Sequence, residues 1–120
     1  MISAIRGATT IETAAREELF GATAEMLQEI MRCNGLTAKQ ITAAFFTVTK
    51  DIQVAFPAEA ARKLGWNECA LMDALEIDVP GALKKCIRVM VLAEVDDNTT
   101  KKHIYLRGAK TLRPDIDGDE

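Results

Sequence analysis

Two arginines lie inside segments that otherwise have the composition of β-strands. Arg88 is in the middle of the apolar run 86–92, and Arg6 interrupts the strand-like segment 2–10. An arginine stays protonated, and a half-buried guanidinium costs several kcal/mol unless an anionic group compensates it. The pair therefore predicts a pocket that receives a negatively charged molecule. The residues alone leave a second interpretation open, in which each arginine pairs with an internal carboxylate or points to solvent.

The composition is that of one globular domain without a strongly basic surface. The 120 residues suffice for one hydrophobic core, and 48% of them are apolar. The formal net charge of −3 argues against a general nucleic-acid binder, and no apolar run is long enough for a membrane span. Because the start of the chain lacks the layout of a signal peptide, we expect a cytoplasmic protein.

The cysteines and the histidine do not follow a metal-binding pattern. Cys33, Cys69 and Cys86 are an odd number without close spacing, and His103 is the single histidine. This arrangement fits neither a disulfide framework nor a zinc site. We therefore expect packed, reduced thiols and no metal.

The hydrophobic spacing predicts the elements that must position the two arginines. Apolar residues three or four apart predict a helix from about residue 13 to 34. Pro57 suits the first position of a second helix, which Gly65 ends. β-Branched and aromatic residues indicate strands. The strands are expected over residues 2–10, 41–49, 66–72, 83–95 and 103–107.

Helices among about five strands indicate an α/β (α+β) domain with a mixed sheet. We expect a single domain over residues 1–115 and an acidic, solvated tail at 116–120. The open face and the edges of such a sheet need a cover, which favours self-association.

Five segments together resemble a known enzyme family. They are 5–10 (IRGATT), 55–62 (AFPAEAAR), 84–90 (KKCIRVM), 103–106 (HIYL) and 112–115 (LRPD). In order and spacing, over residues 2–115, they resemble the monofunctional chorismate mutases of the trimeric, mixed α/β class, not the all-helical class. The resemblance implies a pseudo-α/β-barrel homotrimer with active sites in clefts between neighbouring subunits.

The activity implied by the resemblance is the conversion of chorismate to prephenate, in the shikimate pathway toward phenylalanine and tyrosine. This isomerase reaction is an intramolecular Claisen rearrangement, in which one C–O bond breaks while one C–C bond forms. It requires no cofactor, metal, nucleophile or proton transfer, in agreement with the lack of such a constellation in the sequence. The implied partners are the chorismate dianion and two further copies of the chain, without nucleic acid or membrane.

Four residues take catalytic or substrate-binding roles by resemblance. Arg88 is expected at the ether oxygen, where a fixed guanidinium stabilises the transition state more than the ground state. Arg6 would hold a carboxylate through two parallel hydrogen bonds, and Tyr105 would add a hydroxyl donor at the same end. Glu76 would accept a hydrogen bond from the ring hydroxyl and balance Arg88.

The resemblance also implies a segment that lines the ring side of the substrate. It precedes Glu76 and comprises Met72, Asp73, Ala74 and Leu75. Asp73 stands where a small neutral or thiol side chain is expected, and Glu59 stands where a basic residue is common. These two departures put the detail of the ring contacts in doubt, but not the class of reaction.

Further cleft residues are implied near the second helix and the C-terminus. Phe56 and Ala58 would reach the cleft of the adjoining subunit, with Phe56 as an apolar wall. Arg62 and Arg113 would supply peripheral positive charge that attracts the dianion. Leu112 would contact the substrate as part of a lid.

Two other functions fit the strand arginines. A non-catalytic module for a small anionic metabolite would use both arginines but would leave Glu76 without a role. A trimeric enamine or imine deaminase of similar architecture also places an arginine between subunits. Segment 84–90 favours the mutase over the deaminase.

Overall fold

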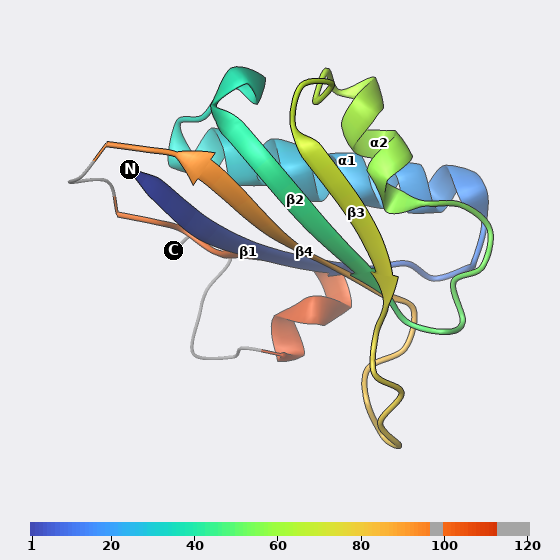
Figure 1. The fold of residues 1–120 in the computed structure, drawn as a ribbon. Coiled ribbons are helices and arrows are strands. Elements are labelled where there is room, and N and C mark those ends of the chain that lie inside the picture. Colours follow the sequence, from blue (N-terminus) through green and yellow to red (C-terminus); the bar gives the residue numbers. More distant parts are fainter. Residues whose placement is uncertain (97–99, 113–120) are drawn as a thin grey trace.

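A five-stranded sheet carries two α-helices on one of its faces (Figure 1). The computed structural model describes residues 1–96 and 100–112. Its elements, with η for 3-10 helices, are β1 (Ile2–Thr10), α1 (Arg16–Asn34), η1 (Ala38–Gln40), β2 (Ile41–Val48), α2 (Pro57–Lys63), β3 (Ala70–Leu75), β4 (Cys86–Glu94), β5 (Ile104–Tyr105) and η2 (Arg107–Thr111). This architecture agrees with the predicted mixed α/β class.

The strand order β3-β2-β4-β1-β5 places β4 at the centre of the sheet. β4 pairs antiparallel with both β1 and β2, whereas β3 and β5 pair parallel with their neighbours. Arg88 lies on β4, a strand that is hydrogen-bonded to a neighbouring strand on each side. The structure therefore holds this arginine on a strand that has no free edge.

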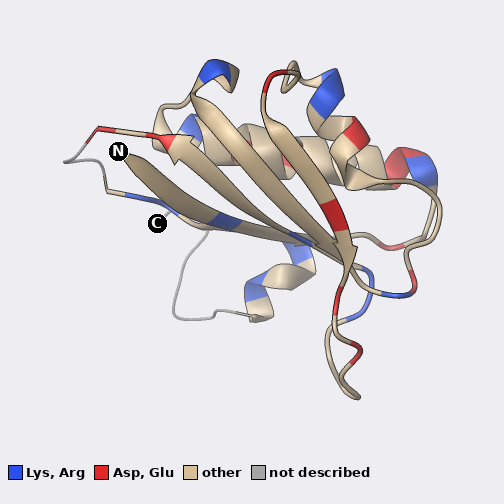
Figure 2. Cartoon of the chain, viewed as in Figure 1, with Lys and Arg blue, Asp and Glu red and all other residues tan. Residues whose placement is uncertain are grey.

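The two faces of the sheet differ in what covers them. Alternate residues of a strand point to opposite faces, and Ile5 and Val91 point to the helix-covered face, where they are fully buried. The other face, which we call the helix-free face, carries Arg6 and Arg88. Its exposed apolar side chains include Ile2, Phe45, Met72 and Met90. Figure 2 shows that charged residues are sparse on the strands and more frequent on the helices and loops.

α1 packs on the sheet through a stripe of buried side chains that recur every three or four residues. The stripe consists of Leu19, Ala22, Met26 and Ile30. The helix ends at Gly35, which adopts a left-handed conformation with φ of 62°. No helix in the described part of the chain is both long and apolar enough to cross a bilayer.

The predicted start of the first helix at residue 13 is wrong, because α1 begins at Arg16. The carboxylate of Glu18 accepts hydrogen bonds from the backbone N–H groups of Glu12 and Thr13 and from the Thr13 hydroxyl. These bonds keep residues 12 and 13 in a non-helical connection. The same hydrogen bonds lower the pKa of Glu18 to about 2, and the bond from the N–H of Glu12 has the largest effect.

Three strand predictions need correction. The strand predicted over 66–72 is β3 at Ala70–Leu75, because Trp66 instead packs into the helix-side core with 1% exposure. The strand predicted over 83–95 begins only at Cys86, because Lys85 has a positive φ of 49°. The segment predicted over 103–107 contributes only Ile104–Tyr105. The acidic tail at 116–120 lies outside the described residues.

Gly7 marks the closest approach of α1 to β1. A Cβ atom at this position would lie 2.8 Å from Cδ1 of Ile30 and 3.2 Å from both Cγ of Met26 and Cγ1 of Val89. Gly21 of α1, in contrast, has no other group within 4 Å of such an atom.

We expect Gly7→Ala to lower the free energy of unfolding by about 1–3 kcal/mol, since the new methyl group must displace close-packed side chains. Gly21→Ala is the matched control and should raise it by about 0.5–1 kcal/mol, through helix propensity. Urea unfolding followed by circular dichroism measures both values. Equal effects of the two substitutions would contradict the close packing at Gly7.

Candidate active site

A single row of residues crosses all five strands on the helix-free face. The paired positions, from β3 to β5, are Ala74, Thr47, Arg88, Ala8 and Tyr105. Arg88 is therefore flanked by the small side chains of Ala8 and Thr47. Small neighbours leave space on the sheet surface beside the guanidinium.

A bulge in β2 is needed to bring Thr47 into this row. The pairing of β2 with β4 shifts by one residue between Ile41 and Ala43. Because side chains alternate, a shift of one residue moves every later side chain to the opposite face. Without the shift, Thr47 would point toward the helices instead of lying beside Arg88.

Arg6 and Arg88 line one cavity of about 330 Å³, which we call the arginine cavity. Arg6 pairs with Met90 in the register of β1 and β4, so the two arginines are diagonal neighbours. Tyr105 and Thr47 line the same cavity. The structure thus brings together Arg6, Arg88 and Tyr105, which the sequence analysis predicted, beside a space that can receive a small anion.

Glu76 lies against Arg88. The Nε atom of Arg88 and the Oε1 atom of Glu76 are 2.8 Å apart, and the Thr47 hydroxyl donates to Oε2 of Glu76 at 3.3 Å. The contact with Arg88 is an ion pair without good hydrogen-bond alignment, because the buried Nε atom has no hydrogen-bond partner among the described residues. The Arg88 side chain remains 43% exposed. Both interpretations of this arginine therefore apply, since it meets an internal carboxylate and also borders a cavity.

Cys86 lies two residues before Arg88 on β4 and is fully buried. Burial and the negative charge of Glu76 raise the pKa of the Cys86 thiol to about 11, although the charge of Arg88 opposes the shift. Such a thiol is protonated at neutral pH and is a poor nucleophile. Within residues 1–96 and 100–112, no three His, Cys, Asp or Glu side chains lie together where they could hold a metal ion.

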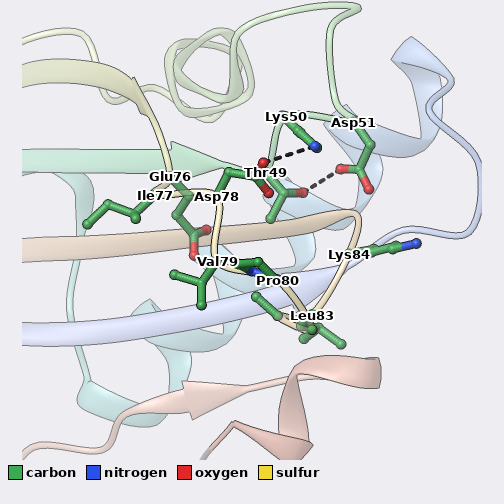
Figure 3. A pocket seen from close by; sticks show the side chains of 12 residues that line it. Thr49, Lys50, Asp51, Glu76, Ile77, Asp78, Val79, Pro80, Leu83 and Lys84 are labelled. Carbon is green, nitrogen blue, oxygen red and sulfur yellow. Dashed lines mark hydrogen bonds and ion pairs between the residues drawn. The ribbon is translucent and has the colours of Figure 1, made fainter.

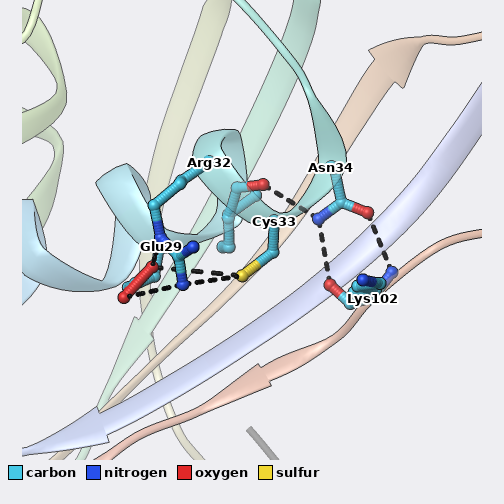
Figure 4. Close-up of polar contacts among 6 residues, drawn as sticks. Glu29, Arg32, Cys33, Asn34 and Lys102 are labelled. Atoms are coloured by element: carbon cyan, nitrogen blue, oxygen red, sulfur yellow. Dashed lines mark hydrogen bonds and ion pairs between the residues drawn. The ribbon is translucent and has the colours of Figure 1, made fainter. Parts of the chain in front are cut away.

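Long-range hydrogen bonds fix the segment that carries Tyr105. The Asn34 side chain, at the end of α1, accepts the backbone N–H of Lys102 at 2.8 Å and donates to its carbonyl at 3.0 Å (Figure 4). His103 follows, and its Nδ1 accepts the backbone N–H of Arg6 at 3.0 Å. These contacts fasten the start of β5 to both α1 and β1.

Tyr105 itself is 5% exposed and forms a small apolar cluster with Ala8 and Ala109. Leu112 packs against this cluster. The predicted lid residue therefore lies beside a residue of the arginine cavity. Arg113, predicted to supply peripheral charge, lies outside the described residues.

The other predicted residues form a second group around α2 and β3. Phe56, which precedes α2, is 64% exposed, Arg62 is exposed, and Ala58 is buried. Phe56 and residues 73–75 line a separate cavity of about 360 Å³, which we call the α2 cavity. Met72 lies on the helix-free face and is 58% exposed. Within one chain, Phe56 and Arg62 do not line the arginine cavity.

The two departures from the family pattern have partners within the chain. The Oδ1 atom of Asp73 accepts the backbone N–H of Ala58 at 3.1 Å, in the first turn of α2. Burial raises the pKa of Asp73, although this hydrogen bond and the charge of Arg62 oppose the shift. Glu59 forms an ion pair with Arg16, 3.2 Å apart. Asp73 thus caps α2 instead of projecting from the helix-free face.

Sequence reasoning missed Thr47 and His103 as parts of the site. Thr47 gave no signal because its place beside Arg88 depends on the bulge in β2. The sequence placed His103 in a segment of the family resemblance and in an expected strand, but gave it no role at the site. Its hydrogen bond with the backbone of Arg6 joins positions 97 residues apart, which no local pattern reveals.

Asp73→Asn tests whether the ionised carboxyl opposes folding. A carboxyl whose pKa is raised in the folded state destabilises the protein when ionised, and this cost disappears as the pH falls through the folded pKa. Asparagine retains an oxygen for the N–H of Ala58. The variant should therefore have a higher free energy of unfolding at neutral pH, and its advantage should shrink as the pH approaches the ordinary Asp value of 3.8. Urea unfolding of the parent and the variant, at neutral pH and near pH 3.8, measures this difference in stability. A variant that is less stable than the parent at neutral pH would contradict the prediction.

Comparisons with known proteins identify the family of the chain. The family model for chorismate mutase type I matches residues 2–116. The chain is 42% identical to chorismate mutase AroH of Thermus thermophilus over 98% of both chains, and 38% identical to chorismate mutase AroH of Bacillus subtilis (strain 168) over 97% of this chain and 93% of that protein. A solved structure of a chorismate mutase from Clostridium thermocellum matches with a TM-score of 0.88 and 50% identity, over 91% of this chain and 98% of that chain. The resemblance found in the sequence is confirmed, and the chain belongs to the chorismate mutase type I family.

Proposed function

We propose that the arginine cavity, with Glu76 beside it, is the site at which this chorismate mutase converts chorismate to prephenate. The observation that carries the proposal is the position of Arg88, which borders the cavity next to Arg6 while it is anchored by Glu76. The enzyme is an isomerase, and its product leads to phenylalanine and tyrosine.

Arg6 and Arg88 have different tasks in this reaction. Chorismate carries two carboxylates, and the planar guanidinium of Arg6 binds one of them with two parallel hydrogen bonds. Arg88 contacts the ether oxygen, on which negative charge grows as the C–O bond breaks. A cation fixed in a central strand needs no reorganisation at that moment, so it stabilises the transition state more than the ground state.

Glu76 orients Arg88 and receives the ring hydroxyl of the substrate. Its two oxygens already contact Arg88 and Thr47, on two neighbouring strands. The carboxylate thereby limits the rotation of the guanidinium. It also accepts a hydrogen bond from the hydroxyl, which places the ring against the enolpyruvyl arm.

The charges within one chain do not balance the substrate. Two guanidinium groups and the Glu76 carboxylate give one net positive charge, whereas chorismate carries two negative charges. Arg62 of a neighbouring subunit, and Arg113, supply the remaining positive charge. This shortfall supports a site completed by a second copy of the chain.

The assembly we propose is a homotrimer whose subunits meet through the helix-free face. Phe45 and Met90, 42% and 41% exposed, project from the same face as the arginines. A neighbouring copy that covers them also brings its α2 to the arginine cavity, with Phe56 just before the first turn of that helix and Arg62 in its last turn.

The two alternative functions predict different results with chorismate. An anion-binding module would bind it without changing it, and a deaminase would act on an enamine or imine instead. Loss of chorismate absorbance with appearance of prephenate identifies the mutase. Membership of the chorismate mutase type I family favours this outcome over both alternatives.

Arg88→Lys should lower kcat at least a hundredfold, equivalent to about 3 kcal/mol, because an ammonium retains the charge but loses the planar fork aimed at the ether oxygen. Arg32→Lys is the matched control, since Arg32 is a 68% exposed residue of α1. Its turnover should stay within twofold of the parent. Chorismate consumption by the purified variants measures both, and turnover of Arg88→Lys within about threefold of the parent would refute the role.

Mixing two inactive variants tests the shared site. Arg88→Ala removes one half of the site and Phe56→Asp damages the other half. If each site combines two subunits, co-expressed variants form mixed trimers in which some sites are intact, and roughly a quarter of the parent activity should return for random mixing. Light scattering should give the mass of a trimer. A monomer, or no gain on mixing, would contradict the shared cleft.

A further inference from the structure

We propose that Asp51 is a positioning residue for Arg88. With Thr49, it holds Lys85 in the left-handed conformation from which β4 starts, and this fixes where Arg88 enters the arginine cavity. The inference deepens the proposed function, because it rests on Arg88 acting in the rearrangement.

The backbone of Lys85 is unusual. Apart from glycines, only Lys85 and Arg107 have a positive φ among the described residues, and that of Lys85 is 49°. This conformation is unfavourable for a residue with a Cβ atom, which approaches the following carbonyl oxygen too closely. The conformation therefore persists only where surrounding contacts impose it.

Asp51 supplies those contacts. The backbone N–H of Lys85 lies 3.1 Å from Oδ1 and 3.0 Å from Oδ2 of Asp51, so both carboxylate oxygens face it. The Thr49 hydroxyl donates to Oδ1 of Asp51, as Figure 3 shows. The same hydroxyl oxygen accepts the backbone N–H of Cys86 at 3.0 Å. Two consecutive N–H groups at the start of β4 are thus bound by the turn that follows β2.

Backbone hydrogen bonds hold the same point from both sides. The N–H of Thr49 donates to the carbonyl of Cys86 at 3.1 Å, and the N–H of Ile11 donates to the carbonyl of Lys85 at 3.0 Å. Residues 85 and 86 are therefore fixed between the ends of β2 and β1. Arg88 follows two residues later on the same face of β4.

The negative charge of Asp51 belongs to this arrangement. Burial acts to raise the pKa of Asp51, but the Thr49 hydroxyl and the N–H of Lys85 outweigh it and hold the pKa below the ordinary value. The carboxylate is ionised at neutral pH and can serve both donors. An alanine would leave both donors without this acceptor, next to a strained residue.

The position of the turn explains why its effect reaches the site. Thr49, Asp51 and Glu76 line one pocket of about 450 Å³ under the loop 77–83 (Figure 3). If the pairing register of β4 shifted by one residue against β1 and β2, Arg88 would point to the helix-covered face. Smaller shifts also matter, because a misplacement of about 1 Å costs on the order of a hundredfold in rate.

A neighbouring ion pair provides a control. Lys50 and Asp78 line the same pocket, 2.9 Å apart, but their side chains are 67% and 61% exposed. Such exposed pairs contribute little to stability. Asp78→Ala therefore removes a carboxylate from the pocket without touching Lys85.

The test combines Asp51→Ala with Lys85→Gly. We expect Asp51→Ala to lower kcat at least tenfold at a temperature where it is fully folded, and Asp78→Ala to stay within twofold of the parent. Glycine adopts a positive φ without the contacts that Asp51 supplies. The kcat of the double variant Asp51→Ala/Lys85→Gly should therefore be within threefold of the kcat of Lys85→Gly alone. If Asp51→Ala does not fold, Asp51→Asn, which keeps one acceptor oxygen, should show a smaller loss that Lys85→Gly also repairs.

Amide hydrogen exchange separates this inference from the proposed function. The N–H groups of Lys85 and Cys86 should exchange faster in Asp51→Ala than in the parent, whatever the activity. A parent protein that does not consume chorismate would contradict the proposed function, but not the binding of the Lys85 N–H by Asp51. An active parent with a folded Asp51→Ala of equal kcat, or a loss that Lys85→Gly does not repair, overturns the inference.

Discussion

The ion pair between Arg88 and Glu76 is the interaction on which the rest of the site depends. A guanidinium in the middle of a central strand cannot lose its charge, and the sheet cannot release it to an edge. Glu76 compensates the charge at Nε, and Thr47 holds the other oxygen of Glu76. Two adjacent strands, β2 and β4, and the residue that directly follows β3 thus meet in one polar contact. The residual exposure of Arg88 is what turns a structural ion pair into a group that can meet a substrate.

In the proposed trimer, the same face of the sheet serves both chemistry and assembly. The helices α1 and α2 lie on one face, while the other combines two arginines with exposed apolar side chains such as Phe45 and Met90. An apolar surface of this kind is stable in water only when it is covered. Its cover excludes water from the arginines as well, and a charge that acts in a drier environment acts more strongly. The proposed subunit association and the proposed electrostatic catalysis therefore use one arrangement of alternating residues.

The sequence revealed what local spacing controls and missed what long-range pairing controls. The strand around Arg88, the helix behind Pro57 and the end of α1 at Gly35 follow from nearest neighbours, and they were predicted. The start of α1 and the place of β3 depend on Glu18 and on the burial of Trp66, which a local pattern does not show. At the site, both arginines stood out because charge interrupts an apolar run. Thr47 and Asp51 did not stand out, because a bulge and a distant backbone N–H give them their roles.

The hydrogen bond between the backbone of Arg6 and His103 has a consequence for how the protein is made. It joins the first strand of the chain to the last, across 97 positions. Contacts between residues so far apart in sequence form late in folding, because the entropy cost of closing a long loop comes before the contact can stabilise the structure. During synthesis, β1 emerges from the ribosome long before β5 exists, so the wall of the arginine cavity that Tyr105 forms is completed only after β5 has been released.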